Sequence, residues 1–429
     1  MRNLEVYIEC NGNMINVGSI TGHNSDDAVF SYSEEYIEDK SSRAISISLP
    51  LDERSFSPER TRCFFESLLP EGYTRRCVAG WLHVDENDYI SVLSELGSEC
   101  LGAIRIVGDM NITESSYRLL SHEELLEFAR EGATKSAELV IKSHLSLAGA
   151  SGKTGLYYDR NNNEWYQPAG LAPSTHILKQ SHVRLKKIVA NEQLCLLTAR
   201  KLGIRTPDSF IINLNDKEDD FLFATERYDR KILDTSKELM GKKVPLRLHQ
   251  EDFAQALGIT ASQKYEKNGK DYLADAFELI KNYSSNPIED QIRLWDLCIF
   301  NYLIGNTDNH VKNIALLYSE DLKGIRLAPA YDLLSTVIYD SSTEKMSLNI
   351  DGEYDIRNIN QKSFENEAKK LGLGKGIATQ HFLSMVEKFE MALEQSTYEL
   401  EEQGYGVAVD IQKQILKKAG IHNFKLTNS

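Results

Sequence analysis

Four residues of the sequence have the types that phosphoryl transfer requires, and they occur in the order Lys179, Asp308, Asn313 and Asp332. Transfer of a phosphoryl group from ATP needs a lysine on the phosphates, a carboxylate that takes the proton of the accepting hydroxyl group, and oxygen ligands for Mg²⁺. Lys179 lies in "STHILKQ", which is typical of a buried strand, and alternation places it opposite Leu178, facing a cleft. These residues are the first candidates for a catalytic site.

The most specific pattern is "FNYLIGNTDNHVKNIALLY", residues 300–318. Its Asp308 and Asn313 are five residues apart, the spacing of the protein-kinase catalytic loop, in which the Asp acts on the hydroxyl group and the Asn binds magnesium. A polar loop whose Asn and Asp form turns and helix caps would explain this spacing alone. Asp332 follows in "RLAPAYDLLST", after "SEDLKG", which is expected to turn a hairpin. Because a carboxylate among apolar residues is unfavourable unless paired or metal-bound, Asp332 is a candidate magnesium ligand.

A small-residue loop precedes Lys179, in "SLAGASGKTGLYYD" at residues 146–159. Its "SGKTG" resembles the end of a Walker loop, but that pattern needs a glycine at position 147, where this chain has leucine, and a helix afterwards. Residues 155–158 and 164–166 are instead aromatic-rich runs around a polar turn, which predicts a β-hairpin. A loop that leads into a strand is the arrangement that covers ATP phosphates in protein kinases.

Two residues at the end of the last predicted strand of this β-rich lobe could bind adenine, Glu226 and Tyr228 in "ATERYDR". Protein kinases hold adenine where such a strand links the two lobes. Tyr228 could equally be a core residue, and Glu226 could pair with Arg227 or Arg230. Both interpretations stay open at this stage.

Three further polar residues have competing interpretations. Glu192 begins a predicted helix over residues 191–202 and could pair with Lys179, although the helix dipole also favours a glutamate in the first turn. His310 could be a base in another kind of enzyme, but no serine or cysteine motif marks a nucleophile for it. His249 in "RLHQEDFAQALG" is expected to be structural, with residues 250–252 starting a helix.

Composition excludes several classes of protein. No run approaches the length of a membrane helix, and the start "MRNLEVYIECNGN" has no signal-peptide pattern, so a cytoplasmic location is expected. The six cysteines form no C-x-x-C pair, which speaks against a zinc site or a disulfide framework. The net charge of −15 gives no general attraction to nucleic acid, and the basic run at 184–187 is expected to be a solvated face.

The order of elements predicts an α+β protein with a two-lobed protein-kinase-like fold, an additional N-terminal α+β subdomain and a helical C-terminal lobe. We expect the subdomain at residues 1–135, a small lobe at 136–240 and the helical lobe at 241–429. In the subdomain, "LEVYIEC", "AISISLPL" and "AIRIVG" are expected to form strands, and residues 63–69 and 89–96 to form helices. Helical runs dominate after about residue 240, namely 251–257, 274–282, 287–304, 363–371 and 379–403.

Seven ordered motifs together resemble the HipA family of bacterial serine/threonine kinases, the toxins of HipBA-type toxin–antitoxin systems. They are "SLAGASGKTG", "STHILK", "NEQLCLLTARKLGI", "ERYDR", "LHQEDFAQALG", "NYLIGNTDNHVKNIALLY" and "LAPAYDLLST". The likeness extends to "FFESLLPEG" and "LGSECLGAIRIV", so it covers most of the chain. The resemblance implies a two-lobed kinase-like fold and transfer of the ATP γ-phosphoryl group to serine or threonine.

The resemblance also implies roles for particular residues. Asp308 would be the catalytic base, Asn313 and Asp332 the Mg²⁺ ligands, and Lys179 a phosphate contact. The other implied nucleotide contacts are Ala150, Ser151, Gly152, Lys153, Glu226, Tyr228, His310 and Lys312. Family toxins phosphorylate a serine of their own loop, which corresponds here to Ser146, and the added negative charge would push the loop away from ATP.

The implied partners are a small helix-turn-helix antitoxin and a protein substrate, for example an aminoacyl-tRNA synthetase. DNA contact would run mostly through the antitoxin, and no membrane is implied. This chain departs from the usual A-G-A-Q-x-K loop by having Ser151 and Gly152 after Ala150, so Ser151 is a second candidate phosphosite. A weakly active member that represses with its antitoxin, or a kinase of a small molecule, stays an alternative.

Overall fold

The computed structural model describes residues 2–108, 114–131, 133–142, 147–148, 152–181, 185, 187–215, 217, 220–267 and 269–425. The chain forms two compact units, each discontinuous in sequence. The first comprises residues 1–182, 212–262 and 315–325, and the second comprises residues 183–211, 263–314 and 326–429. The bounds of these units differ from those of the three domains expected from the sequence, 1–135, 136–240 and 241–429. That three-domain division stays a prediction. Among the helices of the described ranges, none is long and apolar enough to cross a membrane.

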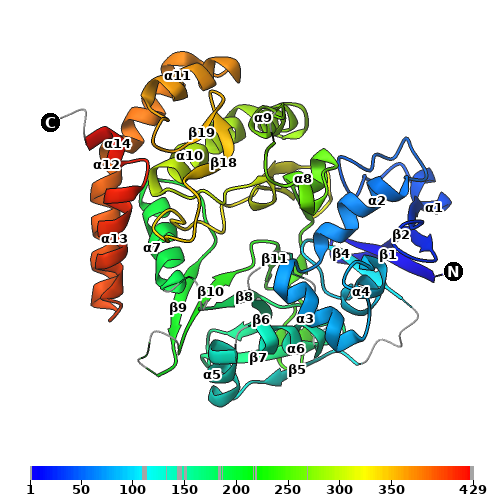
Figure 1. Cartoon of the computed structure of the whole chain (residues 1–429). Helices are drawn as coiled ribbons and strands as arrows, with labels where there is room; N and C mark the ends of the chain where they lie inside the picture. Colours follow the sequence, from blue (N-terminus) through cyan, green and yellow to red (C-terminus); the bar gives the residue numbers. More distant parts are fainter. Residues whose placement is uncertain are drawn as a thin grey trace. The chain divides into compact units, whose positions relative to one another are not determined.

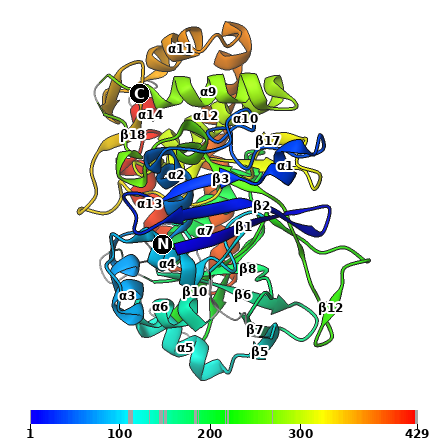
Figure 2. The same cartoon turned by 90° about the vertical axis from the view of Figure 1, so that its right-hand side faces the viewer.

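The amino-terminal part of the first unit contains a four-stranded antiparallel sheet with the order β3-β2-β1-β4. Figure 2 shows β3, β2 and β1 of this sheet side by side. Its strands are β1 (Arg2–Cys10), β2 (Asn13–Gly22), β3 (Val29–Tyr32) and β4 (Ile104–Val107). Its helices are α1 (Glu34–Glu38), α2 (Pro58–Phe65), the 3-10 turn Glu66–Leu68, α3 (Gly72–Leu82) and α4 (Tyr89–Leu96). The ring of Phe30 lies 4.9 Å from that of Tyr32 and 5.1 Å from that of Phe65, which places an aromatic core behind β3.

The strand predicted over Ala44–Leu51 is wrong. This segment makes only an isolated bridge between Ser46 and Leu49. Its alternating Ile45 and Leu49 are fully buried, but they anchor a loop rather than a strand. Side chains from distant parts of the same unit bind this loop, as described below. The local sequence does not predict these contacts.

The second sheet of the first unit carries the predicted phosphate-binding lysine. Its order is β5-β7-β6-β8-β10-β9. The strands are β5 (Ser116–Leu119), β6 (Lys153–Asp159), β7 (Glu164–Ala169), β8 (His176–Gln180), β9 (Ser209–Asn213) and β10 (Phe221–Glu226). The first residues of β9 belong to the second unit. Two helices, α5 (His122–Glu131) and α6 (Ala133–Lys142), precede β6 in the chain. Pairing of Tyr157 with Tyr166 and of Asp159 with Glu164 confirms the predicted hairpin, and a strand rather than a Walker helix follows Gly152.

Short strands and one helix complete the first unit. They are β11 (Arg230–Lys231), β12 (Glu238–Leu239), β13 (Lys242–Lys243), β14 (Leu246–Arg247), β15 (Gln250–Asp252), α8 (Phe253–Leu257), β16 (Ala315–Tyr318) and β17 (Ile325–Leu327), the last of which crosses into the second unit. β16 and β17 are neighbours in one sheet, so the hairpin predicted at "SEDLKG" is confirmed. Residues 250–252 form a strand rather than the predicted first turn of a helix, because Asp252 caps α8 from outside.

The second unit is built around helices. They are α7 (Ile188–Lys201), α9 (Tyr272–Tyr283), α10 (Pro287–Ile304), α11 (Gln361–Lys370), α12 (Lys375–Glu402), α13 (Val407–Lys418) and α14 (His422–Lys425), joined by 3-10 turns at Ala261–Gln263 and Val311–Asn313 and a hairpin of β18 (Lys345–Ile350) and β19 (Glu353–Asp355). α12 packs against α7, α10, α11 and α13 (Figure 1). This packing groups α7 with the helical unit, although the sequence assigned it to the small lobe.

α10 has the bounds that its end signals predict. Pro287 occupies its first turn, where the missing N–H costs nothing, and Gly305 ends it in a left-handed conformation with φ of 70°. A Cβ atom on Gly305 would lie 2.3 Å from Cγ1 of Val337, so only glycine fits. The chain therefore turns sharply at the end of α10 into the polar segment that contains Asp308.

Candidate active site

Buried hydrogen bonds from neighbouring residues fix the polar segment that follows α10. Asn306 donates through Nδ2 to Oδ1 of Asn301 at 2.8 Å, and the backbone N–H of Thr307 donates to Oγ1 of Thr336 at 2.7 Å. Asn306 and Thr307 are 1% and 4% exposed, whereas Asp308 is exposed. The loop thus presents one carboxylate to solvent from a rigid, internally bonded base.

Three contacts bring the other predicted site residues of the second unit toward Asp308. The side-chain amide of Asn313 donates to the carbonyl oxygen of Asp308 at 3.0 Å. The hydroxyl of Tyr331 donates to the carbonyl oxygen of Lys312 at 2.9 Å, and Asn306 donates to the carbonyl oxygen of Asp332 at 3.4 Å. Both ends of the hairpin that separates Asn313 from Asp332 are therefore tied to the same loop.

Asp332 has an unusual backbone conformation. Its φ of 58° lies in the left-handed region, which costs a residue with a Cβ atom energy, although Asp tolerates it better than most. The residue is half-buried, whereas Leu333 beside it is 2% exposed. Backbone strain of this kind concentrates at functional sites. A strained conformation at Asp332 is therefore consistent with a functional role for its carboxylate.

The donor set of this loop fits Mg²⁺. Asn313 uses its amide nitrogen inside the loop, so its amide oxygen is the atom that could bind a metal ion, and Asp332 would add a carboxylate. Mg²⁺ prefers oxygen and commonly takes only one or two protein ligands, with phosphates and water supplying the rest. Among the residues with described positions, no group of three or more His, Cys, Asp and Glu side chains forms an all-protein metal cage. A site completed by nucleotide phosphates is the kind that these residues can make.

Tyr265 contacts the candidate base directly. Its hydroxyl donates to Oδ1 of Asp308 at 2.8 Å, and its ring meets the ring of His310 edge-on with centroids 5.2 Å apart. Both aromatic residues border the loop within the second unit. Sequence analysis did not identify Tyr265, because a lone tyrosine 43 residues before its partner carries no local signal.

His310 and Lys312 are more buried than nucleotide contacts on a loop surface would suggest. They are 5% and 6% exposed. His310 precedes the 3-10 turn Val311–Asn313, and the carbonyl of Lys312 takes the hydrogen bond from Tyr331. Both residues support the loop, and their contact with a nucleotide stays a prediction.

In the first unit, two lysines lie side by side. Lys153 on β6 is directly paired with Lys179 on β8, so both side chains leave the same face of the sheet. The ammonium group of Lys179 lies 5.6 Å above the ring of Phe223, while its neighbour Leu178 is fully buried on the other face, as the alternation predicts. Gly152 is buried just before β6. The other loop residues of the prediction, Ser146, Ala150 and Ser151, lie outside the described residues.

The two predicted adenine contacts, Glu226 and Tyr228, lie at the end of β10 and just after it in the first unit. Glu226 is paired with Arg160 at 3.3 Å rather than with Arg227 or Arg230, and both side chains of this pair are largely exposed. Tyr228 is half-buried and donates its hydroxyl to Oε1 of Gln250. Their contact with adenine stays a prediction.

Glu192 does not lie in the first turn of its helix. α7 begins at Ile188, so Glu192 is one turn inside and is 4% exposed. A favourable interaction with the helix dipole falls off within the first turn and no longer explains it. Its pairing with Lys179 stays a prediction.

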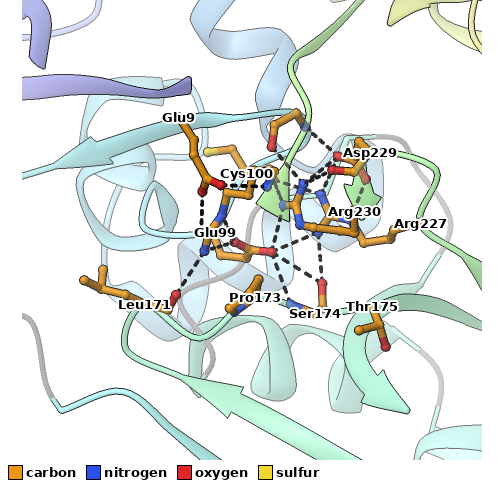
Figure 3. A network of polar contacts seen from close by, with 12 residues as sticks. Glu9, Glu99, Cys100, Leu171, Pro173, Ser174, Thr175, Arg227, Asp229 and Arg230 are labelled. Atoms are coloured by element: carbon orange, nitrogen blue, oxygen red, sulfur yellow. Dashed lines mark hydrogen bonds and ion pairs between the residues drawn. The ribbon is translucent and has the colours of Figure 1, made fainter. Parts of the chain in front are cut away.

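The remaining residues of "ERYDR" form a buried ionic network in the first unit, shown in Figure 3. Glu99 lies between arginines: Nη1 of Arg227 at 3.1 Å, Nη2 of Arg230 at 2.9 Å and Nη2 of Arg247 at 2.8 Å from its carboxylate oxygens. Asp229 bonds Nη2 of Arg227 at 2.7 Å and the N–H of Gly102 at 2.7 Å. The network joins the segment after α4 to the chain that follows β10.

Electrostatics keep this network charged. Burial alone would raise the pKa of Glu99, but the charges of Arg230, Arg247 and Arg227 outweigh it and hold that pKa well below its usual range. The arginine side chains of the network are 5% exposed or less. Sequence analysis missed these residues as a group, since Glu99 stands 128 positions before Arg227.

His249 and Glu251 of "LHQED" are structural within the first unit. Nε2 of His249 donates to the carbonyl of Ile45 at 2.8 Å, and burial lowers the pKa of His249 to about 4. Glu251 accepts from the hydroxyl of Ser46 and the N–H of Ile47. The structural role predicted for His249 is confirmed, and this motif holds the loop that was mistaken for a strand.

Comparison with known proteins assigns the fold first. The chain superimposes on HipA in a Shewanella oneidensis complex of HipA, HipB and operator DNA with a TM-score of 0.79, at 23% sequence identity and over 96% of each chain. The fold is therefore the α+β kinase-like fold that the order of elements predicts.

Sequence comparison then assigns the family. Models of the HipA N-terminal domain and the HipA-like C-terminal domain match residues 8–107 and 145–395. A putative kinase of Sinorhizobium fredii, Y4mE, is 30% identical over 86% of this chain and 87% of its own length. The serine/threonine-protein kinase toxin HipA of Shewanella oneidensis is 26% identical over 81% of this chain and 80% of its own length. The protein belongs to the HipA family.

Proposed function

We propose that this protein is an ATP-dependent serine/threonine-protein kinase and the toxin of a type II toxin–antitoxin system. Its relatives named as kinases support the activity, and so does the loop of the second unit. The observation that carries the proposal is the exposed Asp308 on a buried base, with Asn313 bonded to its backbone and Asp332 tied to the same loop. This is the constellation that phosphoryl transfer needs.

The chain would contribute charge and orientation. Asp308 would accept the proton of the attacking hydroxyl group. Lys153 and Lys179 leave one face of the sheet as directly opposed residues and would bring two positive charges to the ATP phosphates there. Bound to Asn313 and Asp332, Mg²⁺ would neutralise charge on the phosphates.

The remaining contacts with the nucleotide belong to the same proposal. Glu226 and Tyr228 would hold adenine at the end of β10. Ala150, Ser151 and Gly152 would cover the phosphates from the loop before β6. His310 and Lys312 would line the base of the site.

Regulation would act through the loop before β6. Autophosphorylation at Ser146 would add about 1.5 to 2 negative charges near the position of the ATP phosphates and expel the loop. Ser151 is the alternative acceptor, because it replaces the residue usual in the family. Either modification would switch the kinase off.

The partners we propose follow the complex of the Shewanella relative, which holds HipB and operator DNA. A small helix-turn-helix antitoxin would bind this protein in the cytoplasm, and contact with DNA would run through that antitoxin. The protein substrate would belong to translation, for example an aminoacyl-tRNA synthetase, whose loss arrests growth.

Incubation of the purified protein with labelled ATP and Mg²⁺, followed by mapping of the labelled residue, tests the proposal. We expect label on Ser146 in the wild type and labelling slower by a factor of about 10²–10⁴ in Asp308→Ala. Absence of label in the wild type, or equal label in Asp308→Ala, would contradict the kinase proposal. Label confined to Ser151 would overturn only the assignment of the site.

A further inference from the structure

The segment that carries Asp332 has no regular secondary structure of its own. It follows β17 in the second unit, and residues 328–332 belong to no helix or strand, although their positions are described throughout. Backbone groups in such a segment need partners elsewhere in the protein. We call residues 326–332 the strap, because they lead from β17 to the candidate metal ligand Asp332. The place of that carboxylate depends on the contacts that fix the strap.

The second half of the strap bonds other segments of the second unit. The backbone N–H of Ala330 donates to the carbonyl oxygen of Arg205, in the stretch between α7 and β9, at 2.8 Å. The hydroxyl of Tyr331 and the carbonyl oxygen of Asp332 bond the polar loop that follows α10. The first half, residues 326–328, has a different anchor.

This anchor is Asp290 in the first turn of α10. Its Oδ2 atom accepts hydrogen bonds from Nε of Arg326 at 2.8 Å and from the backbone N–H of Leu327 at 3.0 Å. Its Oδ1 atom accepts from Nη2 of Arg326 at 3.1 Å, which makes the contact bidentate and geometrically specific. Arg293 donates to Oδ1 of Asp290 at 2.8 Å and to the carbonyl oxygen of Ala328 at 3.3 Å. Asp290 therefore binds the start of the strap directly and through Arg293.

Asp290 is fully buried and stays charged. Its side chain is 0% exposed, and the hydroxyl of Ser284 adds a further hydrogen bond at 2.7 Å. Burial alone would raise the pKa of this carboxyl, but hydrogen bonds led by those of Arg326 and Ser284 outweigh it, so the pKa is lowered. A carboxylate with several charged and neutral donors is held in one orientation. The strap is thus attached to a fixed point of α10.

α10 is joined to both segments that carry the candidate Mg²⁺ ligands. Its C-terminal end leads through Gly305 into the loop with Asn313, and its first turn binds the strap that ends at Asp332. Residues that orient metal ligands without touching the metal change metal affinity by about 10–100-fold when they are replaced. Asp290 is placed as such a residue, since it lies inside the protein and bonds the chain that leads to Asp332.

We propose that Asp290 is a positioning residue for metal binding, which holds the strap so that the carboxylate of Asp332 is presented together with the amide oxygen of Asn313. The inference rests on the proposed kinase function and deepens it. Because the side chain of Asp290 is fully buried, it acts through the strap rather than by contact with a substrate or metal ion. A loosened strap weakens metal binding, and an excess of metal ion compensates for that loss.

The experiment uses the full chain and measures metal binding without turnover. Mn²⁺ is the probe, titrated in the presence of a non-hydrolysable ATP analogue and followed by electron paramagnetic resonance. Asp290→Asn keeps the size of the side chain and removes its charge, and we expect the Kd for Mn²⁺ to rise about tenfold or more. Asp332→Asn replaces the candidate ligand itself and should raise that Kd at least as much.

The matched control is Asp296→Asn on the same helix. Oδ1 of Asp296 lies 2.7 Å from Nδ1 of His381 on α12, and the side chain is 24% exposed, so this substitution breaks a contact between helices instead of one with the strap. The Kd for Mn²⁺ should stay within about twofold of wild type.

A second strap variant, Arg326→Gln, serves if Asp290→Asn fails to fold. It removes the guanidinium group from the strap and leaves the buried carboxylate its other donors. Because the side chain of Arg326 is 35% exposed and solvent screens part of the ion pair, we expect a smaller rise in the Kd for Mn²⁺, about threefold or more.

A kinetic measurement separates positioning from a general loss of structure. Mg²⁺ is titrated at saturating ATP, and transfer of label from ATP is followed. In Asp290→Asn we expect the half-maximal rate to require about ten times more Mg²⁺, with the rate at saturating Mg²⁺ within about threefold of wild type. A loss of folded protein would instead lower the saturating rate at an unchanged Mg²⁺ requirement.

A Kd for Mn²⁺ within about twofold of wild type in both Asp290→Asn and Arg326→Gln would overturn the positioning role. A lower saturating rate at an unchanged Mg²⁺ requirement, or an equal rise of the Kd in Asp296→Asn, would overturn it as well. A wild type that binds no Mn²⁺ with the analogue and transfers no label would contradict the proposed kinase function itself.

Discussion

The ionic network around Glu99 and the loop around Asp308 are built from similar polar residues but differ in where those residues find partners. Glu99 is 1% exposed and is surrounded by three arginines of its own chain. Asp308 is exposed on a buried base, and its Oδ1 atom accepts a hydrogen bond from the hydroxyl of Tyr265. A carboxylate enclosed by arginines of its own chain is committed to the fold, whereas an exposed carboxylate can be reached from solvent.

The difference also separates two family motifs. "ERYDR" looks like a nucleotide-binding motif, yet Arg227, Asp229 and Arg230 are committed to the network and leave only Glu226 and Tyr228 near the surface. In "GNTDNH", by contrast, the buried Asn306 and Thr307 form hydrogen bonds that fix the loop on which the exposed Asp308 lies. The predictions below test this division of roles.

The largest expected effect is on the network. Glu99→Gln removes the carboxylate that all three buried arginines share and leaves them only Asp229 and Glu9 as acidic partners. Breaking a buried pair in this way costs about 3–5 kcal/mol of the free energy of unfolding. Urea unfolding of the variant and the wild type measures the loss. The exposed Glu38→Gln is the control and should stay within about 0.5 kcal/mol of wild type. A Glu99→Gln protein as stable as the control would refute the stabilising role of the network.

The second effect is a pH dependence from Glu251. Burial raises the pKa of its carboxyl to about 7, despite hydrogen bonds from Ser46 and Tyr318. The folded state therefore holds a proton that the unfolded state releases above about pH 4.5. This stabilisation is complete below that pH and is lost as the pH rises through 7, a change of about 3 kcal/mol.

Unfolding free energies at pH 5 and pH 8 for the wild type and Glu251→Gln measure this effect. The quantity to compare is the change in the free energy of unfolding between the two pH values. Other groups such as His249 titrate in both proteins, so only the difference between the two changes reports on Glu251. We expect the wild type to lose more stability between these pH values than Glu251→Gln. Equal slopes would show that Glu251 is charged in the folded protein at both pH values.

The same contrast explains which features the sequence could predict. α10 was predicted with its bounds because Pro287 and Gly305 mark its ends locally, and the hairpin of β6 and β7 because its turn lies between two short runs. Asp308 and Asn313 could be predicted as site residues because their spacing is a local pattern, and Asp332 because a carboxylate stands among apolar neighbours; their catalytic and metal-binding roles stay predictions.

Features that depend on residues far away in the sequence could not be predicted. Residues 44–51 alternate like a strand, but His249 and Glu251, about two hundred positions away, hold them as a loop. Tyr265 and Glu99 have no motif of their own, and they acquire a role only when folding brings Asp308 or three arginines to them. Such partners can be read from a structure and not from local sequence.

The smallest expected effect concerns Glu226. Its partner Arg160 is 3.3 Å away, with side chains 59% and 44% exposed, so solvent screens the pair. Arg160→Ala should change the free energy of unfolding by less than about 1 kcal/mol in urea titration. A loss as large as that expected for Glu99→Gln would mean that the end of β10 is part of the stabilising network.

The most direct test of the account compares stability and phosphoryl transfer in one variant, Asp308→Ala. We predict a free energy of unfolding within about 0.5 kcal/mol of wild type. Transfer of label from ATP should fall by a factor of about 10²–10⁴, the usual contribution of a general base. Transfer at the wild-type rate, or destabilisation comparable with that of Glu99→Gln, would contradict the assignment of Asp308 as a functional rather than a structural carboxylate.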